Sequence, residues 1–151
     1  MSMNNLKNND IELFKKGLIN ATSEFYLDAI EIFNELIENF SESELVDDAY
    51  YNMGLCYFNM NQMEKALGCY KKVIDDFPNA TITSLETSKE FGKTAAKCHY
   101  GKILCFLLLS EKNTAKEELI QLEKYPDSYI IKENGEKITY HQLAEYAINK
   151  I

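Results

Sequence analysis

The feature of the sequence that most constrains its fold is an internal repeat with an offset of 37 residues. Gly17 and Gly54 keep this offset, and so do Ala29 and Ala66. Four further pairs of similar residues keep it as well: Leu18 and Leu55, Ile30 and Leu67, Phe33 and Tyr70, and Phe40 and Phe77. A repeat of this length indicates a stack of small units, each of which buries its apolar face against the next.

Each repeated unit has the apolar spacing of two helices. In the second unit, Tyr50, Met53, Gly54 and Tyr57 fall on one helix face, at positions i, i+3, i+4 and i+7. The following helix repeats this spacing at Met63, Ala66, Leu67, Tyr70, Val73 and Ile74. The pattern therefore predicts a pair of helices in each unit.

Local signals predict where these helices begin and end. The start of the second unit is predicted by a capping box made of Ser41 and Glu44. The start of its second helix is predicted by Asn61, which Glu64 follows three residues later. Pro78 is expected to end that helix, because proline biases the preceding residue away from the helical region.

This pattern resembles the tetratricopeptide repeat, whose signature is W-x2-L-G-x2-Y, then A-x3-F, then P. The second unit has the matching residues in order: Tyr50, Met53, Gly54, Tyr57, Ala66, Tyr70 and Pro78. The first unit matches less fully, with Leu13, Lys16, Gly17, Asn20, Ala29 and Phe33, and with Ser41 in place of the proline. The resemblance implies an all-α fold, a right-handed superhelix of helix-turn-helix repeats in which the small residues lie where helices cross closely.

A third unit is present, but its spacing has changed. It contains, in the expected order, Tyr100, Gly101, Leu104, Ala115, Leu119 and Pro126. Gly101 and Ala115 are 14 residues apart, whereas Gly54 and Ala66 are 12 apart. The alternatives are a third repeat with a slipped register, or an unrelated helical pair after two repeats.

The connection before the third unit is long. Thr83 and Glu86 predict a cap, so we expect a helix from about 84 to 109, which is longer than its counterparts. The sequence then predicts one domain over residues 1–151. Its repeats are expected at about 10–43, 47–80 and 84–127, with a C-terminal capping segment at 128–151.

The C-terminal segment departs from the repeat pattern. A hairpin that turns at Asn134 and Gly135 would place Lys132 opposite Lys137, which is unfavourable, so a plain turn is an equal alternative. Thr139 with Gln142 is expected to cap a last helix, whose apolar stripe is Tyr140, Leu143, Ala144, Ala147, Ile148 and Ile151. We favour a helix that caps the solenoid over one that is offered to a partner or to a second copy of the chain.

Charge and composition exclude several classes of function. The 151 residues carry a net charge of −8, which argues against a binder of nucleic acid or of anionic membranes. No apolar run is long enough for a membrane span, and no secretory signal is found, so we expect a cytoplasmic protein. The helix ends of the form Asp-Phe-Pro and Tyr-Pro are also similar to those of repeats in bacterial envelope assembly factors, but those proteins carry secretion signals.

The sequence shows no catalytic or metal-binding pattern. The four cysteines form no Cys-x-x-Cys pair, and only two histidines accompany them. Cys98 and His99 are neighbours that diverge on a helix, so a thiol nucleophile with an adjacent base is not expected. The acidic pairs Asp47-Asp48 and Asp75-Asp76 are interpreted as solvated faces or helix-end charges. We therefore predict no enzyme activity and no cofactor.

The resemblance implies a concave groove that binds a peptide or helix of another protein. The residues expected to line it are Phe14, Leu18, Tyr51, Asn52, Leu55, Phe58, Cys98, His99 and Lys102. A carboxylate clamp of the chaperone-binding subfamily is rejected, because among its matching positions only Asn52 agrees and the cationic residues are absent. Two alternatives remain: these residues pack against a neighbouring segment, or the chain is a self-association module that forms a homodimer through its end or its last helix.

Overall fold

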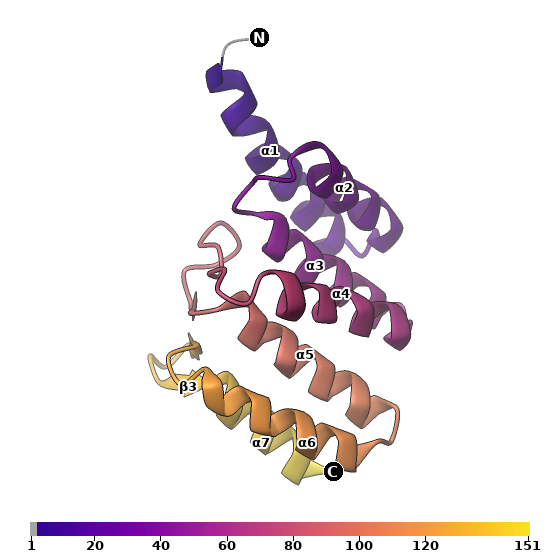
Figure 1. Cartoon of the computed structure of the whole chain (residues 1–151), viewed down its shortest axis with the longest axis vertical. Coiled ribbons are helices and arrows are strands. Elements are labelled where there is room, and N and C mark those ends of the chain that lie inside the picture. Colours follow the sequence, from indigo (N-terminus) through magenta and orange to yellow (C-terminus); the bar gives the residue numbers. More distant parts are fainter. Residues whose placement is uncertain (1–2) are drawn as a thin grey trace.

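The structure, a computed structural model, describes residues 3–151, with side chains from residue 9 onward. The helices are α1 (Met3–Thr22), α2 (Tyr26–Asn39), α3 (Val46–Asn59), α4 (Met63–Asp76), α5 (Thr94–Leu108), α6 (Lys112–Gln121) and α7 (Tyr140–Lys150), with a 3-10 turn at Leu122–Lys124. Three short strands, β1 (Glu90–Phe91), β2 (Tyr129–Ile131) and β3 (Lys137–Thr139), form one antiparallel sheet. The helices stack along the long axis of the molecule (Figure 1). The predicted all-α repeat solenoid is confirmed.

The odd-numbered helices form the inner layer of the stack. Every helix packs against the next one in the chain, from α1 with α2 through to α6 with α7. In addition α1 contacts α3, α3 contacts α5, and α5 contacts α7, whereas within residues 3–151 the even-numbered helices make no comparable contact with one another. Because helices crowd on the inside of a bend and spread on the outside, the concave face is the one formed by α1, α3 and α5.

Two glycines allow the helices of the first two repeats to cross closely. A Cβ built on Gly17 would lie 2.5 Å from the ring of Phe33, and one built on Gly54 would lie 2.5 Å from the ring of Tyr70. Ala29 and Ala66 are completely buried beside these rings. The repeat of 37 residues thus corresponds to the same Gly–aromatic crossing, made once in each unit.

The third repeat has the expected helix pair, but Gly101 is not the structural equivalent of Gly54, with which the sequence pattern aligns it. A Cβ on Gly101 would meet Tyr70 of the preceding repeat at 2.8 Å, and not an aromatic ring of α6. Ile103 is fully buried in the same cluster as Ala115 and precedes it by 12 residues, as Gly54 precedes Ala66. The third repeat is therefore aligned with the second by an offset of 49, two residues more than the glycines suggest.

The expected helix over 84–109 is wrong in its first ten residues. The Thr83 hydroxyl accepts the N–H of Leu85 and closes a turn, and α5 begins only at Thr94. The backbone before it is held by tertiary contacts, because Thr83 N–H donates to the Asp48 carboxylate at 3.0 Å. Gly92, with φ of +106°, lets the chain pass so close to Ser128 that a Cβ would lie 2.3 Å from the serine hydroxyl.

Two predicted caps are also wrong. The start of α3 is at Val46 and uses no side-chain cap, while Ser43 accepts the N–H of Leu45 before it. Asn61 lies in the turn before α4 with φ of +59° instead of capping the helix. The predicted end is confirmed, since α4 stops at Asp76.

The C-terminal segment forms a hairpin followed by a capped helix. Ile131 pairs with Lys137, a register one residue from the one considered above. Lys132 consequently lies opposite Glu136, to whose carbonyl it donates its N–H at 2.8 Å, so the like-charge objection disappears. Thr139 and Gln142 make the predicted capping box of α7. Tyr140, Ala144 and Ile148 of this helix are buried with the third repeat.

Candidate functional site

Leucines occupy equivalent positions of the inner helices in all three repeats. Leu18 of α1, Leu55 of α3 and Leu104 of α5 are related by the structural offsets of 37 and 49, and all three are half-buried. Leu55 and Leu104 belong to none of the core clusters in the described part of the chain. We call these three equivalent apolar positions of successive inner helices the leucine stripe (Leu18, Leu55 and Leu104).

One helical turn further along, the same face carries a second row. Phe58 and Leu107 are half-buried at equivalent positions of α3 and α5, and Leu108 is 60% exposed. Leu104 and Leu107 were missed by the sequence prediction, which placed Lys102 on this face. The signal for the correct register was the spacing of Ala115 and Leu119 from Ile103, which equals that of Ala66 and Tyr70 from Gly54.

Two of the predicted groove residues are core residues. Phe14 is completely buried against Phe33, with ring centroids 5.8 Å apart. Cys98 is completely buried in the cluster that contains Tyr70. Neither side chain is available to a partner in this structure.

His99 and Lys102 face α6 instead of the concave face. Glu118 of α6 lies 2.6 Å from His99 Nδ1 and 3.1 Å from Lys102 Nζ. Burial raises the pKa of Glu118, but the hydrogen bond with His99 and the charge of Lys102 outweigh it, so the pKa is lowered overall. The His99 ring also packs on Tyr125 with centroids 5.7 Å apart. This network holds α5 and α6 together within the third repeat.

Tyr51 and Asn52 lie beneath the segment that connects α4 to α5. Asn52 is buried and donates its side-chain N–H groups to the Asp48 carbonyl and, at 3.4 Å, to Glu86 of that segment. The ring of Tyr51 packs under the ammonium of Lys97, 4.1 Å from the ring centroid. Burial raises the pKa of the Tyr51 phenol to about 12. The connecting segment therefore occupies this part of the concave face.

Lys97 anchors the segment to the solenoid. It is buried, with its Nζ 2.7 Å from Glu90 and 3.9 Å from Glu86. A buried cation needs such partners, because desolvation would otherwise remove its charge. Together with Tyr51, these contacts fix residues 80–91 against α3 and α5.

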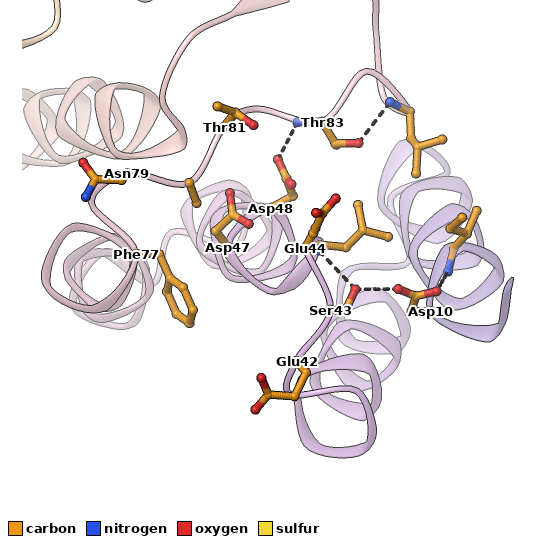
Figure 2. A pocket seen from close by; sticks show the side chains of 14 residues that line it. Asp10, Glu42, Ser43, Glu44, Asp47, Asp48, Phe77, Asn79, Thr81 and Thr83 are labelled. Carbon is orange, nitrogen blue, oxygen red and sulfur yellow. Dashed lines mark hydrogen bonds between the residues drawn. The ribbon is translucent and has the colours of Figure 1, made fainter. Parts of the chain in front are cut away.

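A cavity of about 1010 Å³ opens beside this segment. Its walls come from the middle of α1, the α2–α3 connection, the first turn of α3 and residues 77–85. Figure 2 shows Asp47 and Asp48 beneath Thr81 and Thr83 of the segment. No local sequence pattern marks this site, because its residues come from four separate parts of the chain.

Burial disfavours the ionised form of the cysteine thiols. Burial raises the pKa of Cys56 and Cys105 to about 11, and that of Cys98 well above its ordinary value. Among the residues that the structure describes, no group of three or more metal-ligating side chains could hold a metal ion. No helix in residues 3–151 has the length and apolar character needed to cross a membrane.

Comparisons with known proteins agree with this architecture. The family model described as tetratricopeptide repeat matches residues 47–75, which cover nearly all of α3 and α4. No curated protein sequence matches the chain. Among solved structures, the Yersinia enterocolitica type III secretion chaperone SycD, in complex with a peptide of the translocator YopD, has a similar fold, with a TM-score of 0.57 and 17% identity over 82% of this chain and 77% of that chain. The Gly–aromatic crossing of the helix pairs and the match to residues 47–75 agree with a repeat solenoid of the tetratricopeptide type.

Proposed function

We propose that the chain is a non-enzymatic adaptor that binds a peptide or helix of another protein along its concave face. The observation that carries this proposal is the leucine stripe, which repeats at one position of three successive inner helices. A half-exposed apolar row on a preformed helical surface suits the apolar face of a helix or an extended peptide. The structurally similar SycD supports the proposal, since its structure is that of a complex with a peptide.

The site we propose differs from the sequence prediction in its third repeat. It consists of Leu18, Leu55, Phe58, Leu104 and Leu107. The proposed site leaves out four of the predicted residues, because their side chains pack within or between repeats: Phe14, Cys98, His99 and Lys102. Tyr51 and Asn52 lie on the same face, under residues 80–91.

The test is affinity capture from a lysate of the source organism with a double variant, Leu55→Glu and Leu104→Glu. We expect a partner that the wild type retains to be lost, because carboxylates in the centre of an apolar interface cost about tenfold or more in affinity. The matched control is Leu27→Glu with Ile120→Glu. These side chains are 72% and 59% exposed on α2 and α6, the outer layer.

Circular dichroism first establishes that both double variants keep the helical content of the wild type. Loss of the partner from the groove variant alone supports the proposal. Equal retention by the groove variant and the control variant contradicts it.

Self-association through the C-terminal end is the second candidate. Leu108, Leu109 and Ile151 are 60%, 43% and 70% exposed, and the contact of Lys112 with the Ile151 carbonyl brings the chain end to the start of α6. Sedimentation of the wild type and of Leu108→Glu over a hundredfold concentration range tests this function. A mass that rises with concentration only in the wild type supports it, and a constant monomer mass excludes it.

A further inference from the structure

The cavity beside residues 77–85 is lined by an excess of acidic side chains. Its lining includes Asp10, Glu42, Glu44, Asp47 and Asp48, and it includes no lysine. Among residues 9–151, whose side chains the structure describes, none of these five acids forms a salt bridge. Lys97, whose charge acts on Asp47 and Asp48, is already paired with Glu90.

Asp48 has one oxygen that the fold leaves without a hydrogen bond. Its Oδ1 accepts the Thr83 N–H at 3.0 Å, while its Oδ2 is buried and has no partner among the described residues. The side chain is only 3% exposed and lines the cavity, where Figure 2 shows it next to Thr83. A buried polar atom without a partner is costly, and such atoms are rare in stable structures. Asp48 lies in the first turn of α3, where a negative charge interacts favourably with the helix dipole. This explains an acid at the position, but it does not explain the unpaired oxygen.

The neighbouring acid Asp47 is satisfied and cannot take over this role. The Thr94 hydroxyl donates to Asp47 Oδ2 at 2.5 Å. Desolvation, and then the charge of Asp47, raise the pKa of Asp48 to about 8, against the weaker opposing effects of the Thr83 N–H and Lys97. Glu86 adds to the repulsion. A cation that enters the cavity would reverse this effect and return Asp48 to its ionised form.

The remaining walls of the cavity are apolar. They include Ile11, Leu45, Phe77 and Leu85. Lysine and arginine side chains combine a long apolar stem with a charged end, so they fit a site with apolar walls and carboxylates at one end. An inorganic cation would use only the carboxylates, and the described residues contain no cluster suited to a metal.

The cavity lies at one end of the leucine stripe. Ile11 precedes Leu18 by seven residues in α1, and Asp48 precedes Leu55 by seven in α3. Side chains seven apart share a helix face, so both cavity residues lie on the concave side, two turns toward the helix starts. Residues 80–91 cover Tyr51 and Asn52 between Leu55 and Asp48, so a peptide in the groove would reach the cavity along α1, from Leu18 to Ile11.

We propose that this cavity binds a lysine or arginine side chain of a partner peptide, with Asp48 as the principal acceptor and the apolar walls holding the stem. The inference deepens the proposed function, and it rests on that function for the statement that the cation belongs to a peptide in the groove. The cation site itself depends only on the cavity. The two can therefore be tested separately.

The test uses N-acetyl-arginine amide as the probe, added to the whole chain with labelled Ile and Leu methyl groups and followed by NMR at pH 8.5. The methyl signals of Ile11, Leu45 and Leu85 should shift and saturate, with a dissociation constant on the order of millimolar. The methyl signals of Ile148, which is buried between α7 and the third repeat, should not shift. The uncharged N-acetyl-citrulline amide, which has nearly the same shape, should bind about tenfold more weakly.

Two variants and a matched control separate the role of the Asp48 carboxylate from the general effect of removing one negative charge. Asp48→Asn keeps an oxygen for the Thr83 N–H but removes the charge, and it should weaken the probe about tenfold. Glu44→Gln, at an exposed acid of the rim, should weaken it about twofold. Glu31→Gln, an equal charge change at an exposed site of α2, should leave affinity unchanged.

Absence of saturable shifts up to about 50 mM of probe, or equal binding of the citrulline compound, overturns the cation site. Unchanged affinity in Asp48→Asn overturns the role of Asp48. The Leu55→Glu, Leu104→Glu variant should bind the probe as the wild type does. If the groove variant and the control variant retain partners equally in the capture experiment, while the probe still binds, the proposed function is refuted and the cation site remains.

Discussion

Replacing Gly54 by alanine should destabilise the protein, although alanine is the better helix former. A Cβ at this position would lie 2.5 Å from Cε1 and 2.9 Å from Cδ1 of Tyr70. The ring cannot move away, because its opposite edge lies 2.8 Å from the place of a Cβ on Gly101. Tyr70 is 1% exposed, so it is held between α3 and α5 on both edges.

The expected magnitude follows from two opposing contributions. Glycine to alanine in a helix interior stabilises by about 1 kcal/mol. Overpacking a rigid site costs about 1–3 kcal/mol, and the confinement of Tyr70 on both edges places this site in the upper half of that range. The net loss should be about 1–2 kcal/mol.

The matched control is Gly68→Ala, the same change inside α4. A Cβ on Gly68 would meet nothing within 4 Å, so only the helical gain remains, about 1 kcal/mol. Thermal and urea unfolding followed by circular dichroism should show Gly54→Ala melting about 5 °C lower and Gly68→Ala about 3 °C higher than the wild type. Melting temperatures that move in the same direction for both variants would refute the account of Tyr70.

Three further predictions concern the buried polar groups. The free energy of unfolding should fall as pH rises from 5 to 8, because the pKa of Asp48 is about 8 in the folded chain against 3.8 unfolded, so the folded state holds the extra proton in this window. Urea titrations at four pH values should show that Asp48→Asn removes up to about 1.4 kcal/mol per pH unit of this slope. Lys97→Ala should cost about 2–3 kcal/mol and speed amide exchange over residues 80–91, since it removes the partner of Glu90 and Tyr51; unchanged exchange there would contradict its role as the anchor. The buried thiols are those of Cys56, Cys98 and Cys105. They should react with a disulfide reagent at pH 8 far more slowly in the folded chain than in urea, because burial raises their pKa. Rapid reaction of the folded chain in buffer would refute their burial.

The sequence predicts the first two repeats well because one local device recurs in them. Each has a glycine in its first helix and an aromatic residue 16 positions later, and both are needed for the close crossing. The third repeat was misaligned because Gly101 looks like Gly54 but serves the interface with the preceding repeat. Its own crossing has Ile103 in place of glycine, and only the spacing to Ala115 indicates this.

The connecting segment and the acidic cavity could not be predicted for a different reason. Thr83 and Glu86 have the local pattern of a helix cap, but the Thr83 N–H is taken by Asp48, 35 residues earlier. Asp47 likewise accepts a hydrogen bond from the hydroxyl of Thr94, 47 residues later. Local patterns do not contain such pairings, so a helix-end acid and a tether for a distant loop look alike in the sequence.

The small sheet changes how this chain should unfold. In a plain array of repeats each unit touches only its neighbours, so ends can unravel one unit at a time. Here Glu90 of β1 pairs with Ile130 of β2, which joins the segment before the third repeat to the hairpin after it. The third repeat is thereby enclosed between two parts of one sheet. Residues 80–150 should open as a single cooperative unit, while α1 and α2, which lack such a closure, are free to open first.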